Sequence, residues 1–152
     1  MINRARSCAV TGHRILEKGF NRAKVEEKLS QLIKIGYNEF LVGMALGFDT
    51  VCFQILEKLR ETNNIKIIAC IPCKTQADRF SKNDKKEYER MLLSADEKVV
   101  LSEEYTPYCM QKRNKFMVDN ASVVLAYLRN EKTGTANTVK YAKERQVVII
   151  NV

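Results

Sequence analysis

The sequence contains one histidine, His13, and an odd number of cysteines, five in 152 residues. Catalytic triads require a histidine beside a nucleophile, and zinc sites require paired ligand spacing, so we expect neither a triad nor a bound metal. Cys70 and Cys73 have CxxC spacing. Cys70, however, falls in a predicted strand and not at the helix N-terminus that activates a redox thiol. An odd cysteine count also argues against a disulfide framework, so we expect reduced thiols in the cytoplasm.

Long hydrophobic runs are absent as well. No apolar stretch approaches the roughly 18 residues needed to cross a bilayer, which argues against membrane insertion. The first ten residues, MINRARSCAV, lack the apolar segment of an export signal. A chain of 152 residues with 45% hydrophobic content is of ordinary single-domain size. We therefore predict one cytoplasmic domain over residues 1–152.

The charge is unbalanced, with 26 Lys and Arg against 18 Asp and Glu and a formal net charge of +8. Such a chain attracts anions, which include nucleic acid and a bound phosphate. The cations are spread along the sequence and form no basic cluster. Nucleic acid is therefore an alternative partner that the charge pattern does not favour.

Short β-branched runs alternate with longer segments of helical periodicity. Strands are predicted at residues 7–11, 39–42, 65–71, 98–101, 122–127 and 146–151. Helices are predicted at residues 21–35, 49–60, 85–94, 109–120 and 135–145. The first helix has Asn21 as its N-cap and Gly36 as its C-terminal stop. This repeated β-α order predicts an α/β fold, a Rossmann-like open parallel sheet with helices on both faces.

Ligands of open parallel sheets bind beyond the carboxyl ends of the strands, so the loops there are the first places to search. The loop after the first strand reads Thr11-Gly12-His13-Arg14. Glycine permits a tight turn, and an arginine can bind a phosphate or carboxylate through two parallel hydrogen bonds. The alternative for Arg14 is a solvated side chain. We predict ligand contacts at Gly12, His13 and Arg14.

The loop after the second strand, residues 43–49, contains two glycines and leads into a helix. The free N–H groups and the dipole of a helix N-terminus favour an anion. The loop matches neither the dinucleotide GxGxxG pattern nor a Walker loop. We predict phosphate contacts at Gly43, Ala45 and Gly47. For Asp49 two roles stay open: a carboxylate that complements the helix dipole, or an acceptor for a ribose hydroxyl.

A second glycine-containing helix start occurs at Gly134-Thr135, before the last helix. Alone, a Gly-Thr pair there is usually a cap. Two such helix starts on either side of a switch point in the sheet suggest one anion bound between them. We therefore add Gly134 and Thr135 to the predicted ligand-binding residues.

The helix at residues 109–120 provides further candidates. Arg113 could neutralise a ligand phosphate, and Asp119 is predicted near the mouth of the fifth strand. The alternatives are a solvated base and a helix C-cap. Tyr105 and Tyr108 could stack on a base, or could pack around Pro107.

Together these motifs resemble the YpsA-like family of the SLOG superfamily, named for the Smf/DprA DNA-processing proteins and the LOG phosphoribohydrolases. The residues that carry the resemblance are Thr11–Arg14, Gly43–Asp49, Ile71-Pro72, Gln76, Phe80, Arg113, Asp119 and Gly134-Thr135. The resemblance implies a Rossmann-like fold and a nucleotide-derived ligand bound near Gly12, Gly43, Gly47 and Gly134. It also implies a sensor or regulatory role, with a proposed connection to bacterial cell division or stress.

Two alternatives to a sensor stay open, and a homo-oligomer is compatible with each. The LOG enzymes have a catalytic glutamate after their glycine motif, whereas here Thr135 is followed by Ala136. An N-glycosidase or phosphoribohydrolase would therefore have to use Asp49 and Asp119 as its catalytic carboxylates. The DprA proteins bind single-stranded DNA with the help of other domains, so a lone domain with dispersed lysines is expected to bind it weakly.

Overall fold

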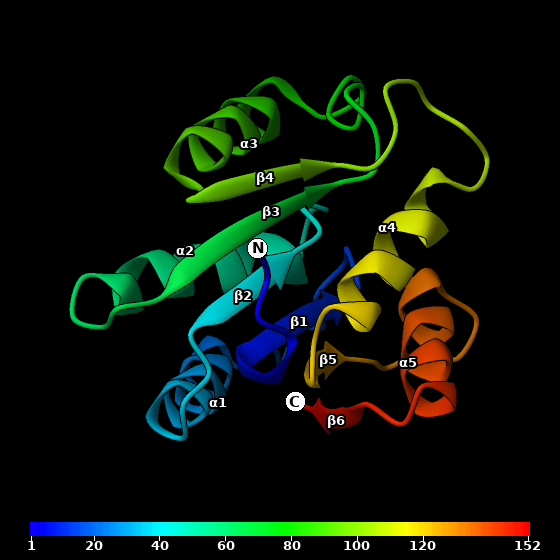
Figure 1. Ribbon diagram of the computed structural model, residues 1–152. Coiled ribbons are helices and arrows are strands. Elements are labelled where there is room, and N and C mark those ends of the chain that lie inside the picture. The colour runs from blue at the N-terminus through cyan, green and yellow to red at the C-terminus, as the bar shows by residue number, and fades with distance from the viewer.

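The computed structural model describes residues 1–152, and a six-stranded parallel sheet forms its centre (Figure 1). The strands are β1 (Ser7–Gly12), β2 (Glu39–Val42), β3 (Lys66–Ile71), β4 (Glu97–Val100), β5 (Val123–Tyr127) and β6 (Val148–Asn151). Their order across the sheet is β4-β3-β2-β1-β5-β6. The chain thus winds outward from β1 to β4 and then returns to the other side of β1. The predicted Rossmann-like fold is confirmed, and its switch point lies between β1 and β5.

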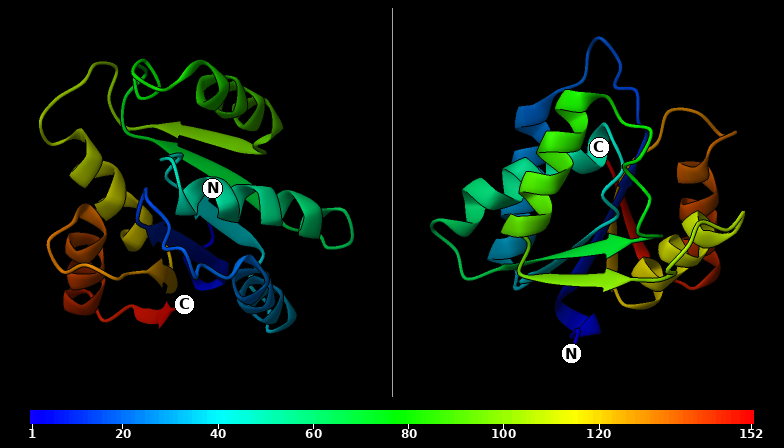
Figure 2. Two further views of the ribbon diagram at one scale, coloured as in Figure 1. Left: turned by 180° about the vertical axis from the view of Figure 1, so that it is seen from behind. Right: turned by 90° about the horizontal axis from the view of Figure 1, so that it is seen from above.

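Five helices cover the two faces of the sheet, as the view from above shows (Figure 2). One face carries α1 (Arg22–Lys34), α2 (Phe48–Arg60) and α3 (Lys82–Ser94); the other carries α4 (Cys109–Asp119) and α5 (Gly134–Glu144). Helix α3 begins three residues before the predicted start, because Ser81 caps it by accepting the Asp84 N–H. A 3-10 turn at Arg4–Arg6 was not predicted. No helix is both long and apolar enough to traverse a bilayer.

The sheet separates two hydrophobic cores. In β1, Cys8 and Val10 belong to the core under α1, α2 and α3, while Ala9 belongs to the core under α4 and α5. This follows from the alternation of side chains along a strand. Because both faces are covered, the central strands read as continuous apolar runs, as in the fully buried β5. Burial of each of these aliphatic side chains stabilises the folded state by about 1.5–3 kcal/mol relative to leaving it exposed to water.

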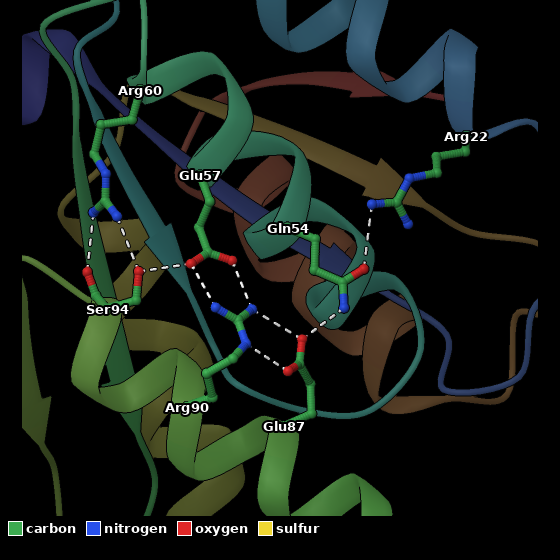
Figure 3. Close-up of polar contacts among 7 residues, drawn as sticks. All are labelled: Arg22, Gln54, Glu57, Arg60, Glu87, Arg90 and Ser94. Carbon is green, nitrogen blue, oxygen red and sulfur yellow. Dashed lines mark hydrogen bonds and ion pairs between the residues drawn. The ribbon is translucent and has the colours of Figure 1, made fainter.

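A polar cluster fixes α3 on α2 (Figure 3). The Arg90 guanidinium donates to both carboxylate oxygens of Glu57, at 2.9 and 2.8 Å, and also to Glu87. Arg60 on α2 donates to the carbonyl and the hydroxyl of Ser94. These contacts hold the edge helix in place, and with it the β3–α3 loop at the carboxyl edge of the sheet.

All five cysteines are buried and unpaired. Burial raises the pKa of Cys8 and of Cys70 to about 12. Thiolate is the reactive form of cysteine, so a pKa this high leaves Cys70 inert at neutral pH. The CxxC spacing of Cys70 and Cys73 therefore reflects a strand end and the loop that follows it.

Candidate functional site

A cleft of about 570 Å³ opens at the switch point, beyond the carboxyl ends of β1 and β5. Its volume is in the range of small-molecule sites. Nine of the residues predicted from sequence line it: Gly12, His13, Arg14, Gly43, Ala45, Asp49, Arg113, Gly134 and Thr135. The β1, β2 and β5 loops and helix α4 thus converge on one space.

His13 connects the β1 loop to the β5 loop. Its Nε2 accepts the backbone N–H of Arg129 at 2.7 Å and that of Asn130 at 3.2 Å. The ring also packs edge-on against Tyr127. A nitrogen that accepts two hydrogen bonds carries no proton, so the ring proton is assigned to Nδ1. His13 therefore shapes the cleft, and in this geometry its Nε2 is not available as an acid.

Two glycines of the site are required by contacts within the protein. A Cβ at Gly12 would lie 2.4 Å from the Phe48 ring, and a Cβ at Gly47 would lie 2.2 Å from the Arg14 carbonyl oxygen. Gly47 also has a φ of +81°, in a region that side-chain-bearing residues avoid. Gly47 does not line the cleft. Because Gly47 has no side chain, the β1 loop can pack closely against the start of α2.

Asp49, in the first turn of α2, is the most unusual group in the cleft. It is only 6% exposed, and its Oδ2 accepts the Ala45 N–H at 3.1 Å. Its Oδ1 is buried and has no hydrogen-bond partner. Burial raises the pKa of Asp49 to about 6, against the opposing effects of Arg113, the Ala45 N–H and Arg14. A buried, half-satisfied carboxylate in a cleft is typical of functional sites.

Arg113 on α4 supplies the opposite charge. It is 6% exposed, and its Nη1 donates to the Gly43 carbonyl. Burial lowers the pKa of Arg113, and the Asp49 charge opposes that shift. Gln76 donates to the same Gly43 carbonyl at 3.0 Å and accepts from the Tyr88 hydroxyl. This supporting role of Gln76 and Tyr88 was not predictable, because Gln76 binds a backbone atom 33 positions away and Tyr88 acts through the Gln76 side chain.

The N-terminus of α5 forms the opposite wall. Thr133 is the N-cap, and its hydroxyl accepts the Ala136 N–H at 3.2 Å. Gly134 and Thr135, which line the cleft, are the first two residues of the helix. Their N–H groups have no partner within the protein, which is the arrangement that binds anions at helix N-termini.

The charge of the cleft is set by three arginines and two carboxylates. Arg129 pairs with Glu17 at 3.3 Å and lies over the Tyr127 ring. Arg14 is exposed and has no ion-pair partner. Because the opposite charges of Arg113 and Asp49 offset each other, and Arg129 pairs with Glu17, Arg14 is the arginine of the site whose charge has no partner. Sequence reasoning missed Arg129 and Glu17, which come together only through the pairing of β1 with β5.

Asp119 lies elsewhere, and its predicted position near the mouth of the fifth strand is corrected. A crossover helix runs antiparallel to the strands, so the end of α4 lies at the amino edge of β5. There Ser122 donates its N–H to the Ser7 carbonyl at the start of β1. The Asp119 carboxylate accepts from Tyr141 at 2.8 Å and pairs with Arg145 at 3.4 Å. It is a surface carboxylate that joins α4 to α5.

Comparison with protein families and curated sequences agrees with this architecture. The model of the YpsA family, described as the YspA SLOG family, matches residues 8–148. The SPbeta prophage-derived protein YoqJ of Bacillus subtilis is 34% identical over 141 residues, which cover 80% of this chain and 81% of YoqJ.

Two solved structures share the fold. DNA processing protein A (DprA) of Streptococcus pneumoniae is 22% identical with a TM-score of 0.69, and 95% of this chain matches 49% of that protein. DNA processing protein A of Helicobacter pylori, described as binding single-stranded DNA, is 16% identical with a TM-score of 0.72. The match covers 99% of this chain and 65% of that protein. The chain thus corresponds to about half or two thirds of these proteins.

Proposed function

We propose that this chain, which belongs to the YpsA family of SLOG proteins, binds a nucleotide or nucleotide-derived anion in the switch-point cleft and acts as a ligand-binding sensor or regulatory domain. The N-terminus of α5 receives the phosphate, at the N–H groups of Gly134 and Thr135. Arg14 adds a charge-assisted hydrogen bond. Asp49 accepts a hydroxyl of the ribose.

The observation that carries this proposal is the buried Oδ1 of Asp49, which has no partner in a cleft that is otherwise rich in donors. Leaving a buried polar atom unpaired costs about 1–3 kcal/mol. A ligand hydroxyl would remove that cost. The Ala45 N–H is already taken by the Asp49 carboxylate, and this negative charge disfavours a phosphate in the β2–α2 loop. The α5 end therefore replaces residues 43–47 as the expected phosphate position.

Thermal unfolding with adenosine 5′-monophosphate, ADP-ribose and NAD⁺ at millimolar concentration tests the proposal. Binding to the native state raises the melting temperature, and the stabilisation grows with the logarithm of the ligand concentration once this exceeds the Kd. Arg14→Ala should weaken binding roughly ten- to a hundredfold, because a hydrogen bond to a charged group contributes about 1.5–3 kcal/mol. Asp119→Asn, outside the cleft, is the matched control and should leave binding unchanged. If none of the three compounds raises the melting temperature, the proposal fails.

An N-glycosidase acting on nucleotides is the second candidate, and the raised pKa of Asp49, about 6, favours it. A carboxyl group that titrates near neutral pH can transfer a proton to a leaving base. The other carboxylate of the cleft, Glu17, is held by Arg129. Base release from nucleoside monophosphates that is lost in Asp49→Asn, while binding persists, would replace the sensor with an enzyme.

Nucleic acid is the remaining partner class, supported by the net charge of +8 and by the shared fold with a DNA-binding protein. Such binding weakens steeply as the salt concentration rises, because it releases counterions. Gel-shift titrations of single-stranded DNA at two salt concentrations separate it from a small-molecule site. Affinity that is strong and salt-dependent, in a protein that binds no nucleotide, would favour this class.

A further inference from the structure

A second cavity adjoins the switch-point cleft. It has a volume of about 600 Å³ and lies between the β2–α2, β3–α3 and β4–α4 loops. Arg14, Ala45 and Met110 line both spaces. The two cavities therefore share these residues as a common wall, and Arg14 lies between them.

The walls of this second cavity differ from those of the cleft. Phe80 and Tyr105 provide aromatic surface, and Phe80 is held edge-on against Tyr88 at 5.7 Å between ring centroids. The Tyr105 side chain is 65% exposed although it is large and aromatic. Thr75 and Arg79 add polar groups to the rim. Aromatic walls with a few polar groups suit a planar ring that stacks and forms hydrogen bonds at its edge.

The Arg14 side chain has no hydrogen-bond or ion-pair partner in the protein. An unpaired guanidinium between two cavities suits a diphosphate that links two halves of one molecule. We infer that the ligand is a dinucleotide-type molecule, an inference that rests on the proposed nucleotide site. One nucleoside occupies the switch-point cleft, the bridging diphosphate extends from the N-terminus of α5 to Arg14, and the second ring stacks in the cavity of Phe80 and Tyr105.

Three compounds test the second ring by calorimetry: ADP-ribose, NAD⁺ and diadenosine diphosphate. The last two differ from ADP-ribose only in carrying a nicotinamide or a second adenine on the distal ribose. We expect at least one of them to bind fivefold or more tightly than ADP-ribose, as stacking of one ring on an aromatic side chain allows. Tyr105→Ala should remove that gain while leaving the affinity for ADP-ribose unchanged.

Tyr108→Ala is the matched control, because Tyr108 is an equally exposed aromatic residue of the same loop that lines neither cavity. It should alter no affinity. If ADP-ribose binds but neither added ring improves affinity, or if Tyr105→Ala weakens all three compounds equally, the inference is overturned and the nucleotide site stands. If none of the three binds, the proposed function fails and this inference fails with it.

Discussion

Replacing Gly47 by alanine should lower the stability of the protein by about 2–5 kcal/mol. The new Cβ would lie 2.2 Å from the Arg14 carbonyl oxygen and 2.6 Å from that of His13. Contacts between carbon and backbone atoms need about 3.5 Å, so the β1 loop must move by roughly 1 Å. Alanine would also be strained at the observed φ of +81° and ψ of −118°, at a cost of about 1–3 kcal/mol. Movement of the loop would break the hydrogen bond from the Phe48 N–H to His13 at 3.1 Å, which adds about 1–3 kcal/mol.

Urea unfolding at 25 °C measures this change, and thermal unfolding should show a drop of roughly 4–20 °C for a chain of this size. Nucleotide affinity, measured well below the melting temperature, should also fall, because the displaced loop carries Arg14. Gly134→Ala is the control for the change in stability only. A Cβ there meets no atom within 4 Å, and alanine in a helix is favoured over glycine by up to about 1 kcal/mol. A Gly47→Ala protein within about 0.5 kcal/mol of the wild type would refute the packing argument.

Three further outcomes follow from the structure. Arg90→Ala should destabilise the protein by about 1 kcal/mol in urea unfolding, and by less at high salt; salt-independent loss would contradict an ion-pair role. Since the pKa of Asp49 is raised from 3.8 to about 6, its protonated form is favoured by folding. The free energy of unfolding of the wild type should therefore rise by up to about 3 kcal/mol relative to that of Asp49→Asn as the pH falls from above 6 to below 4. A difference in stability that does not change with pH would argue against the raised pKa. His13→Ala should speed hydrogen exchange at the Arg129 and Asn130 amides, which Nε2 protects, and equal exchange rates in both proteins would show that the link is dispensable.

The secondary structure was largely predictable because local signals and tertiary packing agree in this chain. Asn21 caps α1 by accepting the Lys24 N–H, and Gly36 has the positive φ expected of a helix stop. The early start of α3 was missed, because its first turn is polar and shows no apolar periodicity. The Ser81 cap, followed three residues later by Asp84, was the available signal.

The gathering of site residues was also predictable, since the carboxyl ends of parallel strands share one edge. The structural role of each glycine was not predictable from sequence, because it depends on contacts between distant segments. Gly12 makes room for the Phe48 ring, and a Cβ added at Gly43 would lie 2.9 Å from the Arg113 guanidinium. A glycine that accommodates a protein neighbour and one that accommodates a ligand look the same in sequence.

The placement of Asp119 determines how the chemistry of the cleft is understood. Hydrolysis of a glycosidic bond uses two carboxyl groups that face each other across the bond. The direction of α4 carries Asp119 to the opposite edge of the sheet, where Arg145 pairs with it. Asp49 is left as the only buried carboxylate in the cleft, opposed by the buried charge of Arg113. A single carboxylate with one unpaired oxygen is suited to accept a hydroxyl, so the arrangement favours recognition of a sugar over cleavage of its bond to a base.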